Sequence, residues 1–448
     1  VLVSASADAE ETLFGARSML AEMVKIARQN APFQEVWALP VTDAGAGVAA
    51  TGTITLTGLT LPVTQAVNFT TYIGGREYTV AVSTASTATT IGDALVAEIV
   101  DDERAAVTAA NVAGVVTLTA RHPGTLGNDI DIRSNLYGDE SALSAEAVNV
   151  AMSGGATDPD LTLGLAALGS EDFSWIGNPY TDTANIALVS SFMDDITGRS
   201  SPLQQLMGHV ISVASNTVAN LSTLGNGLND QHLSVFGVNK SPSPAYSITA
   251  ALSAKAAKHL SAAPELSRPL QFITLEGIHA PSIADRFDVT DQNTLLFDGI
   301  ATYTTSRAGA MQISRLITTY QSNGAGFSDA TFLDVQTMAQ AMYVLRYLRT
   351  KVTNAHGRKG LSSDTSPAVQ GVSRPRDIKN TLVAGYQELV NLGVVEDQET
   401  FERNLVVERN ATDASRVDVY LPFDVVNQLR VLAVAATTFL EFPAEIQQ

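Results

Sequence analysis

Between residues 160 and 285, short apolar runs alternate with amphipathic segments, and this alternation constrains the fold more than any other feature. The apolar runs have the length of strands, and the segments between them have helical periodicity. We expect strands over 173–177, 208–214, 232–238 and 270–278, and helices over 183–197, 217–224 and 248–262. A β-α-β-α-β-α-β order predicts a mainly parallel sheet with helices on its faces.

Residues 42–156 have a different composition, rich in Thr, Val, Ala and Gly and without a single Lys. Alternating runs typical of strands occupy 53–57, 68–73, 78–82 and 115–119. Gly74 and Gly75 indicate a hairpin turn between two of these runs, and one helix is expected over 90–100. We interpret this region as a small β-rich domain inserted into another fold.

The segments on either side complete the expected organisation. An amphipathic helix is expected over 10–30, with Asp8 as its N-cap, followed by a strand over 34–40. The later pattern predicts strands over 294–303, 311–320, 404–409 and 417–421, and helices over 332–352 and 375–392.

The fold class expected is therefore α/β, with a mainly parallel sheet core, the inserted β-rich domain and an α+β C-terminal domain. We expect four parts: 1–41 as the N-terminal part of the core, 42–156 as the insert, 157–330 as the core and 331–448 as the C-terminal domain.

Charge and residue usage exclude several classes of function. The net charge of −19 argues against nucleic-acid binding, because phosphate contacts rely on Lys and Arg. The chain has no Cys, which excludes disulfides, thiolate metal sites and thiol nucleophiles. The longest apolar stretch, 425–442, contains Arg430 and Glu441 among other polar residues, so we expect it to be buried in protein and not inserted in a membrane.

Motifs that carry chemistry are missing from the sequence. The six His show neither the H-E-x-x-H pattern nor another zinc spacing, and neither a G-x-S-x-G elbow nor a Walker A loop occurs. The loop 124–132 has Asn128, Asp129 and Asp131 close together and could hold a cation, but a polar turn is the better interpretation. We therefore expect no catalytic residue, no cofactor and no metal.

Residues 346–379 form the one charge anomaly, with eight basic residues against Asp364 and Asp377. The basic residues are Arg346, Arg349, Lys351, Arg358, Lys359, Arg374, Arg376 and Lys379. A solvated helix end followed by a loop explains them as well as a docking surface for an acidic partner does, so both interpretations stay open.

Several short motifs resemble, in their order and spacing, the tail sheath proteins of Mu-like bacteriophages. They are FQEVWALP at 33–40, ATGTITLTG at 50–58, DRFDVTDQNTLLFDGI at 285–300, RLITTY at 315–320, YLR at 347–349, LVVER at 405–409 and VYLPFDVVNQLRVL at 419–432. Each motif alone is weak, but together they span most of the chain.

The resemblance implies a structural subunit with a core called subtilisin-like for its topology, without protease activity, and an outward-facing insert. Such subunits form a helical homo-oligomer, for which hexameric rings are one arrangement, around a tail tube protein, and meet baseplate and tail terminator proteins. Neither nucleic-acid binding nor membrane insertion is implied. The expected location is the virion tail, assembled in the host cytoplasm. The family's N-terminal arm is not visible before Val1, so we expect upstream residues to be missing.

Two site hypotheses follow from the resemblance. Arms that add strands to neighbouring subunits link the sheath, and we expect such an inter-subunit arm near the C-terminus, at Val425, Val426, Leu429, Val431 and Phe439. We expect the tail tube to be faced by Arg374, Arg376 and Lys379. The alternatives are a tail-associated hydrolase, recognisable by a cleft with a nucleophile–His pair or converging carboxylates, and a glycan-binding adhesin, testable by a glycan screen of 42–156.

Overall fold

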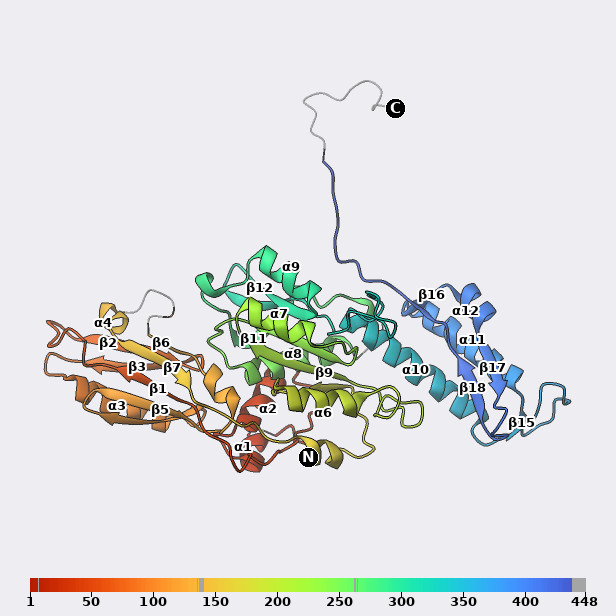
Figure 1. The fold of residues 1–448 in the computed structure, drawn as a ribbon, viewed down its shortest axis with the longest axis horizontal. Coiled ribbons are helices and arrows are strands. Elements are labelled where there is room, and N and C mark those ends of the chain that lie inside the picture. Colours follow the sequence, from red (N-terminus) through yellow and green to blue (C-terminus); the bar gives the residue numbers. More distant parts are fainter. Residues whose placement is uncertain (7, 135, 137–140, 262, 264, 437–448) are drawn as a thin grey trace, which may run out of the picture.

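The computed structural model describes residues 1–436 apart from residues 7, 135, 137–140, 262 and 264 (Figure 1). Three bodies lie in a row: the β-rich residues 42–156 at one end, a central α/β body, and a C-terminal body from which an extended tail stands out. Among the described residues, no helix has the length and apolar character needed to cross a bilayer.

The central body is built on a six-stranded sheet in the order β11-β13-β12-β10-β9-β8. The strands are β8 Trp175–Gly177, β9 His209–Ser215, β10 Leu233–Val238, β11 Thr274–His279, β12 Ile300–Thr305 and β13 Ala310–Arg315. Neighbours from β8 to β12 run parallel, whereas β12–β13 and β13–β11 are antiparallel. The prediction of parallel strands is confirmed for β8, β9 and β10. It is wrong for β11, which lies at the antiparallel edge because β12 occupies the place beside β10.

Helices cover this sheet, and short polar side chains set where several of them begin. They are α5 Thr162–Ala167, α6 Thr183–Met193, α7 Val218–Asn226, α8 Ala245–His259 and α9 Val289–Phe297, with short 3-10 turns at Glu265–Ser267 and Ile283–Asp285. Asp182 caps α6 by accepting from the Asn185 N–H. At α9, Asp288 and Asp291 form a capping box. The strand predicted over 294–303 is therefore wrong in its first half, since 294–297 continue α9.

The N-terminal helix predicted over 10–30 is two helices, α1 Ala9–Phe14 and α2 Met19–Asn30. Gly15, in the left-handed region at φ +88°, separates them, and Ser18 caps α2 through the Ala21 N–H. Asp8 makes no side-chain cap, contrary to expectation. The strand expected over 34–40 is reduced to one bridge between Leu2 and Trp37, because its partner is only the short N-terminal stretch 1–3, whose Val3 N–H donates to the Val36 carbonyl at 3.0 Å.

Residues 42–156 pack around a hydrophobic core of their own. One sheet has the order β4-β5-β1-β7 and a second the order β3-β2-β6. The elements are β1 Thr51–Thr55, β2 Val67–Ile73, β3 Arg76–Val82, α3 Ala88–Asp101, β4 Val107–Val112, β5 Val115–Ala120, the 3-10 turn Thr125–Asp129, β6 Ile132–Ser134, α4 Ala142–Ala145 and β7 Val148–Ser153. The hairpin expected at Gly74 and Gly75 is confirmed, and both glycines have positive φ.

Ion pairs join this β-rich body to the central one. Arg104 lies 2.5 Å from Glu22 of α2, and Arg133 lies 3.4 Å from Asp285. Arg133 also donates to the Lys240 carbonyl at 2.8 Å. Two of the four Arg residues of this body are therefore engaged with the central body rather than presented outward.

The C-terminal body packs two long helices, α10 Val335–His356 and α11 Pro375–Asn391, against small β elements and one short helix. These are β14 Gly360–Leu361, β15 Val372–Ser373, β16 Val395–Glu396, α12 Gln398–Asn404, β17 Val406–Arg409, β18 Val417–Tyr420 and β19 Asp424–Val425. Tyr386 of α11 stacks on Phe401 of α12 with ring centroids 3.7 Å apart, and both side chains are fully buried. This stack ties α12 and the late strands to α11.

Candidate functional site

An extended segment, residues 424–436, begins with β19 and leaves the C-terminal body, and we call it the arm (Figure 1). β19 pairs antiparallel with β16, matching Val395 with Val425, and the Val426 N–H donates to the Val394 carbonyl at 3.1 Å. Beyond this root the chain makes no further strand pairing within the described residues. The first two predicted arm residues, Val425 and Val426, thus belong to the body side of the arm.

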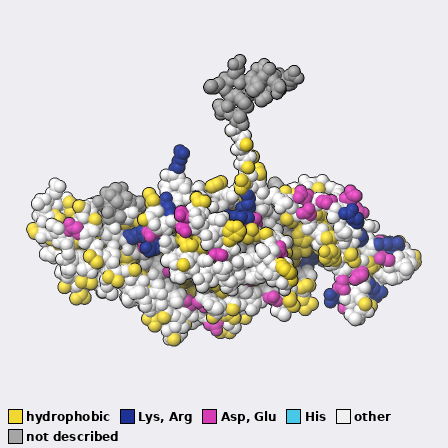
Figure 2. Space-filling view, turned by 45° about the horizontal axis from the view of Figure 1, so that its top comes forward, with side chains coloured by type: hydrophobic (Ala, Val, Ile, Leu, Met, Phe, Trp, Pro, Cys, Tyr) yellow, Lys and Arg dark blue, Asp and Glu magenta, His cyan; other side chains and the backbone are white. Residues whose placement is uncertain are grey.

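The outer part of the arm exposes apolar side chains. Leu429 is 77% exposed and Val431 79% exposed, and Leu432 and Val434 are similarly open. Figure 2 shows hydrophobic side chains on this stalk where it stands clear of the body. The expectation that 425–442 is buried is therefore wrong for this part, because no other segment among the described residues covers it. Phe439 lies outside the described residues.

The hairpin of β17 and β18 offers a second assembly feature. It is a two-stranded sheet, so each strand has one edge without a strand neighbour among the described residues. Val406, Val419 and Tyr420 are exposed on it. An edge with free N–H and C=O groups beside exposed apolar side chains is suited to accept an added strand.

The basic segment is less positive in the structure than its sequence indicates. Four of its eight basic side chains have a partner within the same chain. Arg346 pairs with Asp172 at 2.6 Å, Lys351 with Glu388 at 2.6 Å and Arg374 with Asp377 at 2.8 Å, and Lys379 donates to the Leu405 carbonyl at 2.8 Å. The other four are exposed and make no ion pair with the described residues: Arg349, Arg358, Lys359 and Arg376. Lys and Arg gather with Asp and Glu over this body in Figure 2.

The three residues predicted to face the tube therefore differ in what they do. Arg374 precedes α11 and donates to the Asp377 carboxylate from its backbone N–H at 3.0 Å and from its guanidinium at 2.8 Å, and these hydrogen bonds lower the pKa of Asp377 to about 2. Lys379 is half-buried against Leu405. Of these three residues, only Arg376 has an exposed guanidinium without an ion pair among the described residues. The prediction of a tube contact therefore depends chiefly on Arg376.

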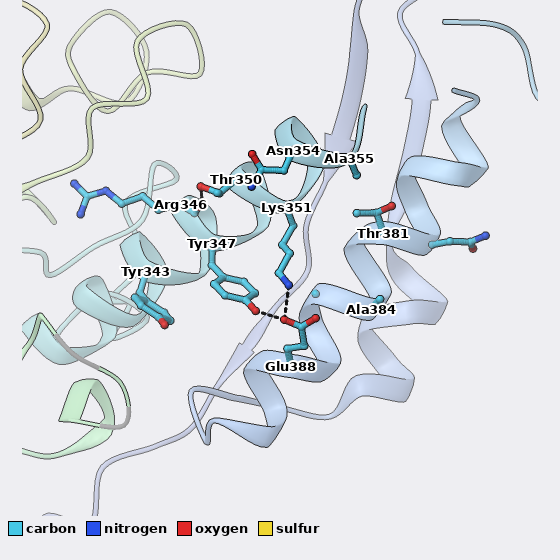
Figure 3. Close-up of a pocket in the computed structure, with 12 residues that line it drawn as sticks. Tyr343, Arg346, Tyr347, Thr350, Lys351, Asn354, Ala355, Thr381, Ala384 and Glu388 are labelled. Carbon is cyan, nitrogen blue, oxygen red and sulfur yellow. Dashed lines mark hydrogen bonds and ion pairs between the residues drawn. The ribbon is translucent and has the colours of Figure 1, made fainter. Parts of the chain in front are cut away.

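A surface groove of about 950 Å3 runs between α10 and α11 (Figure 3). Tyr347 donates to the Glu388 carboxylate, and Lys351 lies 2.6 Å from the same group. Tyr343 stacks on Tyr347, with ring centroids 6.1 Å apart. Lys351 and Tyr347 engage Glu388, the one carboxylate among the described residues that line the groove, so no two carboxylates converge there. Thr381 of the lining lies 2.8 Å from His356 Nε2, and Nδ1 of the same ring lies 2.7 Å from Ser373 Oγ, so hydroxyl groups engage both ring nitrogens.

A further Ser–His contact, in the central body, also bears on the hydrolase alternative. His209 Nε2 lies 2.8 Å from Ser234 Oγ, within hydrogen-bonding reach of a nucleophile. Both residues are 0% exposed within the central sheet, so a substrate has no access to them. The pair joins neighbouring strands β9 and β10, which makes it a core contact.

The candidate cation loop also has a structural role. Asn128 donates to the Gly155 carbonyl at 3.0 Å and accepts from the Gly155 N–H at 2.8 Å, so it fixes the exit of the β-rich body. Burial, reinforced by the nearby Asp158, raises the pKa of Asp129 to about 7. No group of three or more possible metal ligands occurs in the described part of the chain. The polar-turn interpretation is the one this geometry favours.

The sequence missed Gln340, which is fully buried on α10 and contacts the root of the arm. Its Nε2 donates to the carbonyls of Val426 at 2.9 Å and Val394 at 3.3 Å. A buried Gln that donates to carbonyls of two different segments can be recognised only from the fold, since neither carbonyl is near it in sequence.

Comparisons with known proteins agree over nearly the whole chain. The model of the phage tail sheath protein central domain matches residues 154–319, and that of the phage tail sheath C-terminal domain matches 328–438. Over 436 residues the chain is 35% identical to the Mu-like prophage FluMu tail sheath protein of Haemophilus influenzae, covering 97% of this chain and 88% of that one.

Two solved structures are also similar to the chain. The sheath tail protein Lin1278 of Listeria innocua has a TM-score of 0.49 at 11% identity, over 94% of this chain and 88% of that one. A chain of the anti-feeding prophage baseplate has a TM-score of 0.42 at 12% identity, over 62% and 72%. From the family matches and the prophage relative, the chain belongs to the phage tail sheath protein family.

Proposed function

We propose that this chain is the protomer of a contractile tail sheath, which polymerises around a tail tube and contracts to drive the tube through the host envelope for genome delivery. Its partners are further copies of itself, the tail tube protein, and baseplate and tail terminator proteins. It acts in the virion tail after assembly in the host cytoplasm. We propose further that the α/β central body is the sheath core that the resemblance calls subtilisin-like, and that it acts without protease activity.

The observation that carries this proposal is the arm, whose outer apolar side chains are not covered by any other segment that the structure describes. Burying a Leu or Val side chain contributes roughly 1.5–3 kcal/mol, so Leu429, Val431, Leu432 and Val434 favour association with another surface. A second copy supplies a suitable surface at the β17–β18 hairpin, where main-chain hydrogen bonds add to the apolar contact.

Such a link explains how bodies can rotate without losing contact. Strand addition fixes the arm to the neighbour through main-chain hydrogen bonds, and the exposed stalk between the two bodies can change direction. Contraction is then a rigid-body change between two packings, with the free-energy difference residing in the interfaces. This mechanism needs no nucleotide.

Removing the arm tests the proposal. We expect deletion of residues 425–448 to leave a folded monomer that forms no sheath polymers by electron microscopy. The structure offers a sharper variant, deletion of 431–448, which retains the pairing of Val425 with Val395 and the Val426 hydrogen bond. It should fold like the full chain and still fail to polymerise. Normal polymers from the shorter chain would contradict the arm as the link.

The contact with the tube is testable at Arg376. Because this guanidinium is exposed and unpaired among the described residues, we expect Arg376→Glu to weaken co-sedimentation with tail tubes roughly two- to fivefold at low salt. The difference should shrink as salt rises. Arg403→Glu, at an exposed Arg of α12 outside the basic segment, is the matched control. Equal binding of the variant and the full chain at low salt would remove Arg376 from the tube contact.

A further inference from the structure

The residues of the arm root alternate between two faces. Gln428 and Arg430 turn toward α10, while Asn427, Leu429 and Val431 are exposed. This period of two is that of an extended strand. The inward face is polar and the outward face largely apolar. Polar contacts therefore hold the arm to its own body, and the apolar side chains remain available to a neighbouring subunit.

Arg430 is the last described residue held by the body. Its Nη2 lies 2.9 Å from an Asp334 oxygen and donates to Gln336 Oε1 at 3.1 Å. Its side chain is 13% exposed, and that of Asp334 is 15% exposed. Residues 431–436 are all exposed and make no hydrogen bond or ion pair with the described chain.

Asp334 is itself held in place by a second guanidinium. It is the N-cap residue of α10, but its carboxylate makes no bond to the helix N–H groups and accepts instead from Arg315 Nε at 3.1 Å and Nη2 at 3.2 Å. Arg315 ends β13 of the central sheet. The carboxylate therefore connects the central sheet, the start of α10 and the arm at one point.

We infer that the contact of Arg430 with Asp334 and Gln336 is a clasp that fixes where the arm leaves the body, so that the inter-subunit link bends only from Val431 onward. This inference rests on the proposed function of the arm. It makes Arg430 a positioning residue for assembly, which presents Leu429 and Val431 to a neighbour in one direction.

The clasp can be measured in the full-length monomer by hydrogen exchange. We expect Arg430→Gln to raise exchange in peptides covering 424–432 by about tenfold or more, because the root loses its buried ion pair. Peptides from the middle of α10 should be unchanged. The control is Arg416→Gln, which removes an exposed ion pair with Asp418 in the same body and should leave the root protected. If hydrogen exchange over 424–432 is the same in Arg430→Gln as in the unsubstituted protein, the clasp is overturned.

A conservative variant keeps the test decisive if Arg430→Gln lowers the Tm of the whole chain. Arg430→Lys keeps the charge but replaces the planar guanidinium, whose Nη2 contacts both Asp334 and Gln336, with an ammonium of different reach and shape. We expect its root exchange to lie between those of the full chain and Arg430→Gln, with an unchanged Tm. Exchange as slow as in the full chain would show that charge alone holds the root and would overturn the clasp.

Polymerisation separates this inference from the proposed function. An arm with a free root must be ordered on binding, so we expect the critical concentration of Arg430→Gln for assembly to rise about tenfold. If deleting 431–448 abolishes polymers but Arg430→Gln leaves root exchange and critical concentration unchanged, the link stands and the clasp is wrong. If Arg430→Gln frees the root but the deletion still polymerises, the clasp stands and the link is wrong.

Discussion

Replacing Tyr386 by Ala is expected to destabilise the C-terminal body by about 3–5 kcal/mol, the usual cost of removing a buried aromatic ring. The ring is fully buried and stacks on Phe401. Its hydroxyl donates to the Glu396 carbonyl at 2.7 Å and accepts from the Asp424 N–H at 3.2 Å. Tyr386 therefore supports both strands of the small sheet from which the arm departs.

Hydrogen exchange of α11 and α12 in the full-length chain measures this loss within the body where it occurs. Tyr386→Phe keeps the stack and removes only the hydroxyl, so we expect about 1–2 kcal/mol, with faster exchange concentrated at β16 and β19. Tyr420→Ala, at a side chain that is 65% exposed, should change stability by about 0.5 kcal/mol or less. Unchanged exchange of α11 in Tyr386→Ala would show that the stack does not hold this body together.

The second large effect expected is a loss of stability in acid that depends on His209. Full burial, with a smaller contribution from His232, lowers the pKa of His209 to about 3. In the unfolded chain the pKa is the ordinary 6.5. The unfolded state therefore binds the proton more readily, and stability falls as the pH decreases from about 6.5 toward 3. Between pH 7 and pH 4 this amounts to about 3 kcal/mol.

His232 shifts in the opposite sense and serves as an internal contrast. Burial opposes its protonation, but the Asp195 carboxylate at 2.8 Å and its neighbour Asp230 raise the net pKa of His232. The contribution of His232 to the stability of the fold is therefore fully present below about pH 6.5 and is lost as the pH rises through the pKa of His232 in the folded state.

Urea unfolding from pH 4 to pH 8 tests both signs, followed by exchange or fluorescence of the central body. We expect His209→Gln, which can still hydrogen bond Ser234, to flatten the acid limb. His232→Gln should steepen the acid limb relative to neutral pH. His259→Gln, at the half-buried end of α8, is the comparison: partial burial and the neighbouring Lys258 also lower the pKa of His259, so this variant should flatten the acid limb less than His209→Gln does. An acid limb that survives in His209→Gln would assign the effect to other groups.

Local sequence pattern predicted much of the secondary structure but not the neighbours of each strand. The runs that became β8, β9 and β10 lie where the periodicity placed them, because burial and hydrophobic period follow directly from local residues. The pattern predicted β11 as the next parallel strand, yet β11 pairs antiparallel with β13. Strand order depends on which segment reaches a sheet edge, which local periodicity does not contain.

Charge gave the clearest difference between sequence and structure. In sequence the segment 346–379 is strongly basic, but Asp172 and Glu388, which neutralise two of its cations, lie outside it. Only the fold brings these carboxylates within ion-pair distance. The tube-facing prediction at Arg374, Arg376 and Lys379 stays a prediction, narrowed by the structure to its one exposed, unpaired member.

By itself the sequence determined the family, the order of most elements and the absence of catalytic motifs, since these depend on residue identity and local spacing. Only the tertiary structure decided that 424–436 forms an arm with an exposed apolar face and is not buried core. The same apolar residues suit either state, and the choice depends on whether another segment covers them. Here α10 takes Gln428 and Arg430 on one face, and nothing in the described chain takes Leu429 and Val431 on the other.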